Sequence, residues 1–263
     1  MKMNKLTKKC LFFSLIWFWM AFASLFPIPL GAAEMTANDL VYFTEKFPPH
    51  NYLKNGPLQG VSVEILQLIW QKLGVSKNRE DIAVVPWARA IKQLETEPNM
   101  VLFGMGFTSE RAKKFHWVGP YYTHELCLIS KKNRGITISN LEQAKNFSIG
   151  VVRQDIGHQT LKSLGFKEKT LDLSSDLDQL HKKFIRNRFE LICYAKDTYF
   201  KYLGHSGHNP DEFKVNYVIS VMKSGFGFSK QIPFPLIQNF QAALDELLAD
   251  QSVERILKKY DLR

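Results

Sequence analysis

In the stretch GHSGHNP, two histidines stand three positions apart, His205 and His208, and imidazole is a common ligand of zinc and related metals. A metal site needs further ligands from cysteine, carboxylate or histidine side chains. The stretch itself offers none, and its glycines and proline predict a loop. We therefore predict no metal site at this pair.

Motifs that carry catalysis or nucleotide binding are absent from the sequence. It contains no GxGxxG, GxxxxGKS/T, GxSxG or HExxH motif and no paired CxxC. We therefore predict a protein that is not an enzyme, with no catalytic residues, no metal and no cofactor. Because there is no nucleotide-binding loop, any ATP hydrolysis linked to its function belongs to a partner.

Strand-like and helix-like patterns alternate along the chain. Short apolar runs predict strands at 41–44, 82–85, 100–105, 147–152 and 191–195. Apolar residues at helical spacing predict helices at 61–73, at 86–94, around 161–164, at 177–185 and at 235–260. This alternation is typical of an α/β fold with largely parallel sheets. No linker rich in glycine and serine divides the chain, so any lobes must be joined by strands that cross between them.

The first 33 residues are typical of a secretory signal peptide. Four lysines precede the apolar run Leu11–Phe26, and small residues follow at Gly31 and Ala33. The alternative is an uncleaved anchor, but the run is shorter than the roughly 20 residues that span hydrocarbon. We therefore predict cleavage before Glu34 and a mature protein in the periplasm.

The net charge of +10 does not indicate a nucleic-acid-binding protein. Four of the 35 lysines and arginines lie in the predicted signal peptide, so 31 remain against 25 acids and the net charge falls to +6. These basic residues form no clustered stripe. We therefore expect no nucleic-acid partner.

Two cysteines of the mature chain could pair in an oxidising compartment. Cys127 and Cys193 each lie inside an apolar, strand-like run, HELCLIS and ELICYA. Buried free cysteine behaves as a small hydrophobic residue, so we favour free thiols over a disulfide.

Several spaced motifs resemble the bacterial extracellular solute-binding proteins of family 3, the polar amino-acid type of periplasmic binding protein. They are TEKFPPHNYLKNGPLQGVSVEIL, VPWARAIKQLE, NMVLFGMGFTSERAKKFHWVGPYYTHELCLISKK, FSIGVVRQDIGHQTLKSLGF and FGFSKQIPFPLIQNFQAALDELLADQSVERILKKYDL. The resemblance covers residues 38–263 and implies two α/β lobes joined by two crossover hinge strands, with a ligand enclosed between the lobes. The expected division is a signal peptide at 1–33, a first lobe at 34–126 and 218–263, and a second lobe at 127–217.

The resemblance also implies a ligand clamp. Arg111 occupies the arginine position of the family's T-x-x-R motif, which holds the ligand's carboxylate. A planar guanidinium suits this role because it forms two parallel charge-assisted hydrogen bonds. The alternative is a surface arginine in the helix around RAKK.

Four further residues of the first lobe match positions that can contact ligand. Phe47 matches the aromatic residue that covers the ligand, where a ring attracts an ammonium group or packs on carbon, although a purely structural packing role is the alternative. Glu45 would select a cationic group if it faces the cleft, but it could equally be an exposed strand-end residue. Trp87 and Arg89 resemble a subgroup motif, although helical spacing also permits core and solvent positions for them.

Two glycines bracket Met105 after a predicted strand. Gly104 and Gly106 would expose backbone groups to a ligand, unless they are simple turn residues. Relatives often carry a hydroxyl at the second position, so Gly106 departs from the family pattern.

The second lobe departs from the family at two positions. Asp155 stands where relatives offer bare amides to an anion, and it could itself cap the helix that follows. The family's amino-binding aspartate has its best counterpart in Asp197, but the spacing from Glu190 is two residues longer than is usual in the family, so Tyr194 or Ala195 could occupy that place.

Together these features predict a periplasmic solute-binding protein that acts as a monomer. It would capture a small polar solute, an amino acid or a related carboxylate, for the membrane permease of an ABC-type uptake system. One alternative is a periplasmic enzyme of the same fold resembling cyclic-acid dehydratases, with Glu45, His50 and Asp155 as acid–base candidates. Another is a sensing module for a membrane receptor, since fold alone does not fix function.

Overall fold

The computed structural model describes residues 34–53 and 56–262. From Met35 onward the chain folds as one compact unit. The predicted signal peptide lies outside the described residues. Among the described residues, no helix has the length and apolarity needed to cross a membrane.

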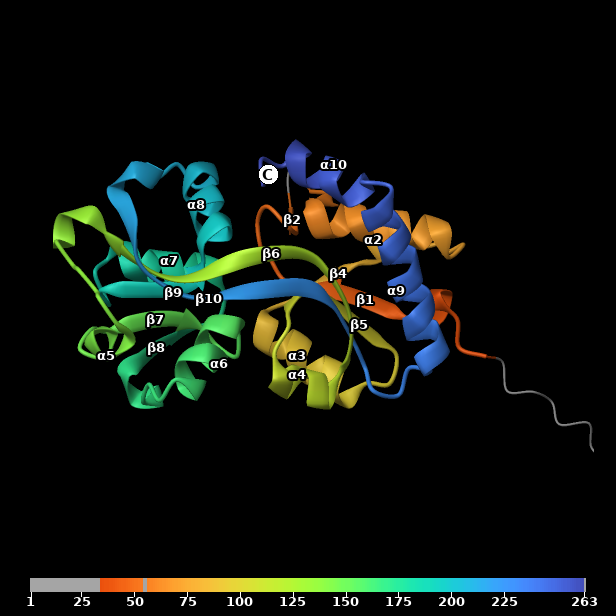
Figure 1. The fold of residues 1–263 in the computed structure, drawn as a ribbon, viewed down its shortest axis with the longest axis horizontal. Coiled ribbons are helices and arrows are strands. Elements are labelled where there is room, and N and C mark those ends of the chain that lie inside the picture. The colour runs from red at the N-terminus through yellow and green to blue at the C-terminus, as the bar shows by residue number, and fades with distance from the viewer. Residues whose placement is uncertain (1–33, 54–55, 263) are drawn as a thin grey trace, which may run out of the picture. The chain divides into compact units, whose positions relative to one another are not determined.

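A mixed eight-stranded sheet organises the described chain, in the order β4-β1-β5-β10-β6-β9-β7-β8 (Figure 1). Its strands are β1 Val41–Thr44, β4 Ala83–Val84, β5 Met100–Gly106, β6 His116–Lys131, β7 Ile149–Val152, β8 Leu171–Ser174, β9 Leu191–Ala195 and β10 Phe213–Phe228. A two-stranded sheet pairs β2 Tyr52–Leu53 with β3 Leu58–Gln59. The outer strands pair in parallel on both sides, β1 with β4 and β5, and β7 with β8 and β9.

Two long antiparallel strands, β6 and β10, run through the whole sheet. Their pairing extends from Phe213 opposite Lys131 to Phe228 opposite His116. At one end β10 also pairs with β5, and at the other β6 pairs with β9. The two strands therefore join a first lobe, built on β1, β4 and β5, to a second lobe, built on β7, β8 and β9. The predicted lobe boundaries at 126/127 and 217/218 fall inside β6 and β10 and stay a prediction, because each strand serves both lobes.

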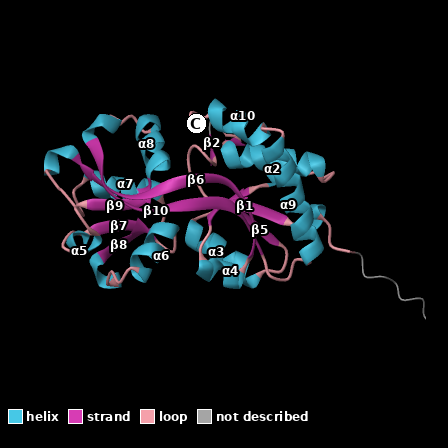
Figure 2. Ribbon diagram, viewed as in Figure 1, coloured by secondary structure: helices cyan, strands magenta, loops and turns pink. Residues whose placement is uncertain are grey.

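Helices pack on both lobes (Figure 2). The first lobe carries α2 Val61–Lys72, α3 Trp87–Thr96, α4 Ser109–Lys114, α9 Phe234–Ala249 and α10 Ser252–Lys259. The second carries α5 Leu141–Ala144, α6 Ile156–Ser163, α7 Leu177–Ile185 and α8 Lys196–His205. The prediction of an α/β chain is confirmed.

The apolar residues form three clusters. In the first lobe Tyr42 on β1 meets Trp70 on α2 edge-on, with ring centroids 4.8 Å apart, and Phe228 meets Phe240 on α9 at 5.0 Å. A separate cluster fills the second lobe. The remaining cluster includes side chains of both lobes, so apolar packing continues from one lobe to the other. Burial of these rings favours folding by roughly 25 cal/mol per Å².

The cysteines on β6 and β9 are free thiols. Cys127 and Cys193 are both buried, in agreement with the sequence-based preference. Burial raises the pKa of Cys127 to about 12.

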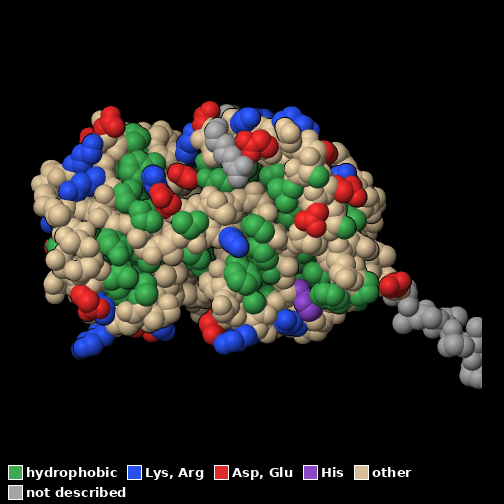
Figure 3. All heavy atoms as spheres, in the orientation of Figure 1, with side chains coloured by type: hydrophobic (Ala, Val, Ile, Leu, Met, Phe, Trp, Pro, Cys, Tyr) green, Lys and Arg blue, Asp and Glu red, His purple; other side chains and the backbone are tan. Residues whose placement is uncertain are grey.

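On the face drawn in Figure 3, acidic and basic side chains are scattered over both lobes, with apolar side chains between them. This distribution agrees with the expectation that the positive charge is dispersed.

Candidate functional site

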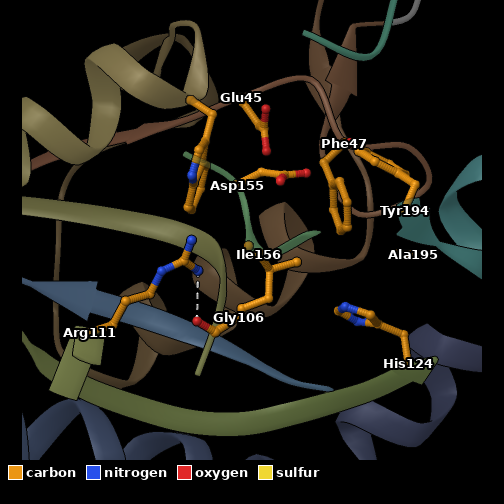
Figure 4. A pocket seen from close by; sticks show the side chains of 11 residues that line it. Glu45, Phe47, Gly106, Arg111, His124, Asp155, Ile156, Tyr194 and Ala195 are labelled. Atoms are coloured by element: carbon orange, nitrogen blue, oxygen red, sulfur yellow. Dashed lines mark hydrogen bonds between the residues drawn. The ribbon is translucent and has the colours of Figure 1, made fainter. Parts of the chain in front are cut away.

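A cavity lies between the two lobes, at the carboxyl-terminal ends of β1, β5 and β9 (Figure 4). It is lined by Glu45, Phe47, Trp87, Gly104, Gly106, Arg111, His124, Asp155, Ile156, Tyr194 and Ala195. Its volume is about 20 Å³, roughly enough for one water molecule. A solute larger than water can therefore enter only if the lobes move apart.

Arg111 lies on α4 with its side chain buried in the cavity wall, so the structure does not place it on the surface. The hydroxyl of Thr108 caps α4 by accepting from the Arg111 backbone N–H at 3.0 Å. Nη1 donates to the Gly106 carbonyl at 2.8 Å and Nη2 to the Gln154 carbonyl at 3.4 Å, while Nε has no hydrogen-bond partner in the described chain. The guanidinium carbon lies 4.9 Å from the ring centroid of Trp87. Burial lowers the pKa of Arg111 to about 10, so the group is cationic at neutral pH.

Glu45 follows β1 and points into the same cavity (Figure 4). Only 9% of the residue is exposed, and its carboxylate forms no hydrogen bond or ion pair within the described residues. Burial raises the pKa of Glu45 well above its ordinary value, and the charge of Asp155 adds to the rise while Arg111 opposes it.

Asp155 enters the cavity from the second lobe as the N-cap of α6. Its Oδ1 accepts the His158 backbone N–H at 2.8 Å. Burial raises its pKa to about 7, against the backbone hydrogen bond of His158 and the charge of Arg111. The cavity thus brings two carboxyl groups and one guanidinium together.

Aromatic side chains form much of the remaining wall. Phe47 lies 6.1 Å from His124 and 5.9 Å from Tyr194 between ring centroids. On the other side Trp87 Nε1 donates to the Gln154 carbonyl at 2.8 Å. Because Trp87 belongs to the first lobe and Gln154 to the second, this hydrogen bond links the lobes.

Gly104 and Gly106 both line the cavity, and at each position a side chain would crowd a neighbouring residue. Gly104 has a φ of +75°, and a Cβ there would lie 3.0 Å from Oδ1 of Asn51. At Gly106 a Cβ would lie 3.3 Å from Cδ1 of Ile156, so the missing side chain lets the second lobe approach.

Two of the predicted site residues are not in the cavity wall. Arg89 is exposed on α3. Asp197 accepts a hydrogen bond from the Tyr122 hydroxyl at 2.6 Å and lines a different cavity of about 270 Å³ beside α8. Tyr194 and Ala195, the alternatives to Asp197, do line the central cavity.

His124 and Ile156 line the cavity without having been singled out from the sequence. A histidine within the apolar stretch HELCLIS was the available signal for His124. Ile156 gave no signal, because it reaches the cavity only through packing between the lobes.

The remaining histidine candidates are arranged unfavourably for catalysis or metal binding. His50 is buried outside the cavity wall with both ring nitrogens unpaired within the described chain, and burial lowers its pKa to about 3, so it is a poor general base. His205 forms a 2.7 Å hydrogen bond with the Lys201 carbonyl. The described residues include no group of three or more potential metal ligands.

Comparison with known proteins places this geometry in a family context. A family model for bacterial extracellular solute-binding proteins, family 3, matches residues 40–262. The arginine-binding extracellular protein ArtP of Bacillus subtilis (strain 168) is 25% identical over 224 residues, covering 81% of this chain and 82% of that protein.

Two solved structures show the fold. The arginine-, lysine-, histidine-binding protein ArtJ from Geobacillus stearothermophilus has a TM-score of 0.73 at 17% identity, covering 84% of this chain and 94% of its own. A histidine kinase sensor domain with similarity to periplasmic binding proteins has a TM-score of 0.75 at 16% identity, covering 84% and 95%. The predicted fold of two lobes joined by crossover strands is therefore confirmed.

Proposed function

The chain belongs to family 3 of the bacterial extracellular solute-binding proteins, and we propose that it captures a small polar solute between its lobes in the periplasm. The solute is an amino acid or a related carboxylate. The observation that carries this proposal is the buried guanidinium of Arg111, which lines an interlobe cavity together with two carboxyl groups.

Arg111 would hold the carboxylate of the solute. A carboxylate leaving water needs fixed donors to replace its hydration. The guanidinium supplies a planar, charged fork, and its Nε has no competing partner in the described chain. Trp87 stacks near the guanidinium and restricts its orientation.

Glu45 and Asp155 would receive the amino or other cationic group of the solute. A cation between them would favour the ionised form of both carboxyls, which burial otherwise opposes. A solute with one carboxylate and at least one cationic group therefore complements the guanidinium and the two carboxyl groups of the cavity. ArtP and ArtJ are named as binding basic amino acids, which have this composition.

Delivery of the solute to the permease of an ABC-type transporter is the function that fits family membership best. A second candidate is sensing, because a histidine kinase sensor domain matches the fold with a TM-score of 0.75. The chain would act as a monomer in either case, and the second lobe would be contributed by residues 127–217.

A thermal-shift screen of the mature chain against amino acids and organic acids tests the proposal. A ligand at 100 times its dissociation constant should stabilise the folded chain by about 2.7 kcal/mol. Arg111→Ala should abolish this stabilisation while the unliganded chain still unfolds in a single cooperative transition, at a lower temperature because two hydrogen bonds of the buried guanidinium are lost. Arg89→Ala, which alters an exposed arginine of the same lobe, is the matched control and should respond like the wild type.

Two results would contradict the proposal. If no solute stabilises the wild type, the chain is not a binder of this class. If a stabilising solute is recovered chemically altered, the enzyme alternative holds instead, since a binding protein returns its ligand unchanged.

A further inference from the structure

The two sides of the cavity differ in chemistry. Figure 4 shows Arg111 on one side and His124, Phe47 and Tyr194 across from it, with Ile156 between. If the carboxylate of a solute binds Arg111 and the rest of the solute spans the cavity, its opposite end would therefore contact the aromatic rings of Phe47, His124 and Tyr194. On that side, the imidazole of His124 has a ring nitrogen without a hydrogen-bond partner among the described residues.

His124 projects from β6, where the strand passes from one lobe to the other. The residue is 4% exposed. Nδ1 lies 3.3 Å from the hydroxyl of Ser224 on β10, and Nε2 has no hydrogen-bond partner among the described residues. A buried polar atom without a partner is unfavourable unless something else supplies the bond. Figure 4 shows this ring directed into the cavity.

The surroundings keep His124 uncharged. Burial lowers its pKa to about 4, and the opposing charge of Asp197 does not offset this. His50, whose ring centroid lies 6.4 Å away, is buried as well and has a pKa of about 3. At neutral pH the residue therefore offers a hydrogen bond without a charge.

We infer that His124 contacts the captured solute and sets specificity by hydrogen-bonding to an uncharged polar group at the end of the solute remote from its carboxylate. This inference rests on the proposed function, which supplies the carboxylate on Arg111. The class of solute is an amino acid whose side chain ends in an amide or a neutral heteroaromatic ring. An apolar side chain of the same shape fits the rings but leaves Nε2 unpaired.

Two pairs of amino acids of similar shape test the inference: L-glutamine with L-methionine, and L-histidine with L-phenylalanine. The dissociation constants of all four are measured by calorimetry for the wild type and for His124→Phe. The wild type should bind the polar member of at least one pair at least tenfold more tightly, a difference of about 1.4 kcal/mol. In His124→Phe the two members of that pair should bind within a factor of about three of each other, because the ring remains and the hydrogen bond is lost.

Two further variants separate specificity from folding. His124→Gln retains a hydrogen-bonding group and should keep a preference for the polar member of the pair. This variant still tests the inference if His124→Phe does not fold. His116→Phe alters a histidine at the start of the same strand, outside the cavity wall, and should leave the preference unchanged.

The outcomes distinguish this inference from the proposed function. An equal preference in the wild type and His124→Phe overturns the role of His124. Binding of only L-lysine, L-arginine or organic acids by the wild type overturns the solute class but leaves the proposed function standing. Failure of the wild type to bind any amino acid or organic acid overturns both.

Discussion

Replacement of Asp155 by asparagine should make the unliganded protein more stable at pH 8 than the wild type. Asparagine can cap α6 as well as aspartate does, so the 2.8 Å hydrogen bond from the His158 N–H has a replacement. What changes is the ionisation of a carboxyl group that burial disfavours. The pKa of Asp155 is raised from 3.8 to about 7 in the folded chain.

The sign and size of the effect follow from this shift. Below pH 3.8 the carboxyl is protonated in both the folded and the unfolded chain. Between about pH 4 and pH 7 only the unfolded chain loses the proton, so stability falls as pH rises. Each pKa unit corresponds to 1.36 kcal/mol, and the full shift to about 4 kcal/mol at pH 8. Removing the charge also removes one cause of the raised pKa of Glu45, which adds to the gain.

Urea unfolding of the wild type and Asp155→Asn between pH 4.5 and 8 measures the effect. The difference between the two free energies of unfolding should grow from pH 4.5 to about pH 7 and level off towards pH 8, because both states are ionised above the folded pKa. The contributions of the other titrating groups are the same in both proteins and cancel. Asp176→Asn is the matched control and should give a much smaller difference, because Asp176 caps α7 outside the cavity wall by accepting the Gln179 N–H at 2.8 Å and contributes least to the raised pKa of Glu45. A difference curve that is flat, or that falls with pH, would refute the reasoning. Ligand binding by Asp155→Asn should be weakened at the same time.

Two other predictions concern the lobe contact and the thiols. Trp87→Phe removes the hydrogen bond to the Gln154 carbonyl, which is worth about 1 kcal/mol, and should increase the ratio of open to closed molecules about fivefold. Small-angle scattering of the unliganded protein measures this ratio. An unchanged scattering profile would contradict a role for this bond in closing the lobes. Cys127 and Cys193 should react with a thiol reagent only after unfolding, since both are buried with raised pKa values, and rapid labelling of the native protein at pH 8 would show that β6 and β9 open locally.

The elements with strong local signals were predictable from sequence. Gly74, with a φ of +66°, follows the end of α2, and α3 begins directly after Pro86, as glycine and proline preferences indicate. The strand β10 was not predicted from its own residues. In KVNYVISVMKSGFGF many side chains are half-buried on both faces, so the stretch lacks the clear alternation of a strand with one buried face.

The residues of the site were harder to predict from sequence, because packing between distant segments decides which of them line the cavity. Arg111 and Phe47 were found because they lie in motifs whose local structure positions them. Asp197 was chosen as the best counterpart of the family's aspartate, but β9 ends at Ala195 and the helix α8 begins at Lys196, which carries Asp197 out of the cavity wall. Ile156 packs against Gly106, which stands about 50 positions earlier in the chain. No local sequence pattern predicts this contact.

The path of β10 has a consequence for biogenesis. Because the second lobe is an insertion between β6 and β10, its sequence is complete before α9 and α10 have been synthesised. The first lobe cannot complete its core until its C-terminal helices are present. Before α9 packs, Tyr42 lacks its neighbour Phe240, whose ring centroid lies 6.5 Å away in the folded chain. A chain shortened by its final helices would therefore expose the apolar face of the first lobe to proteolysis and aggregation, even if the second lobe had folded.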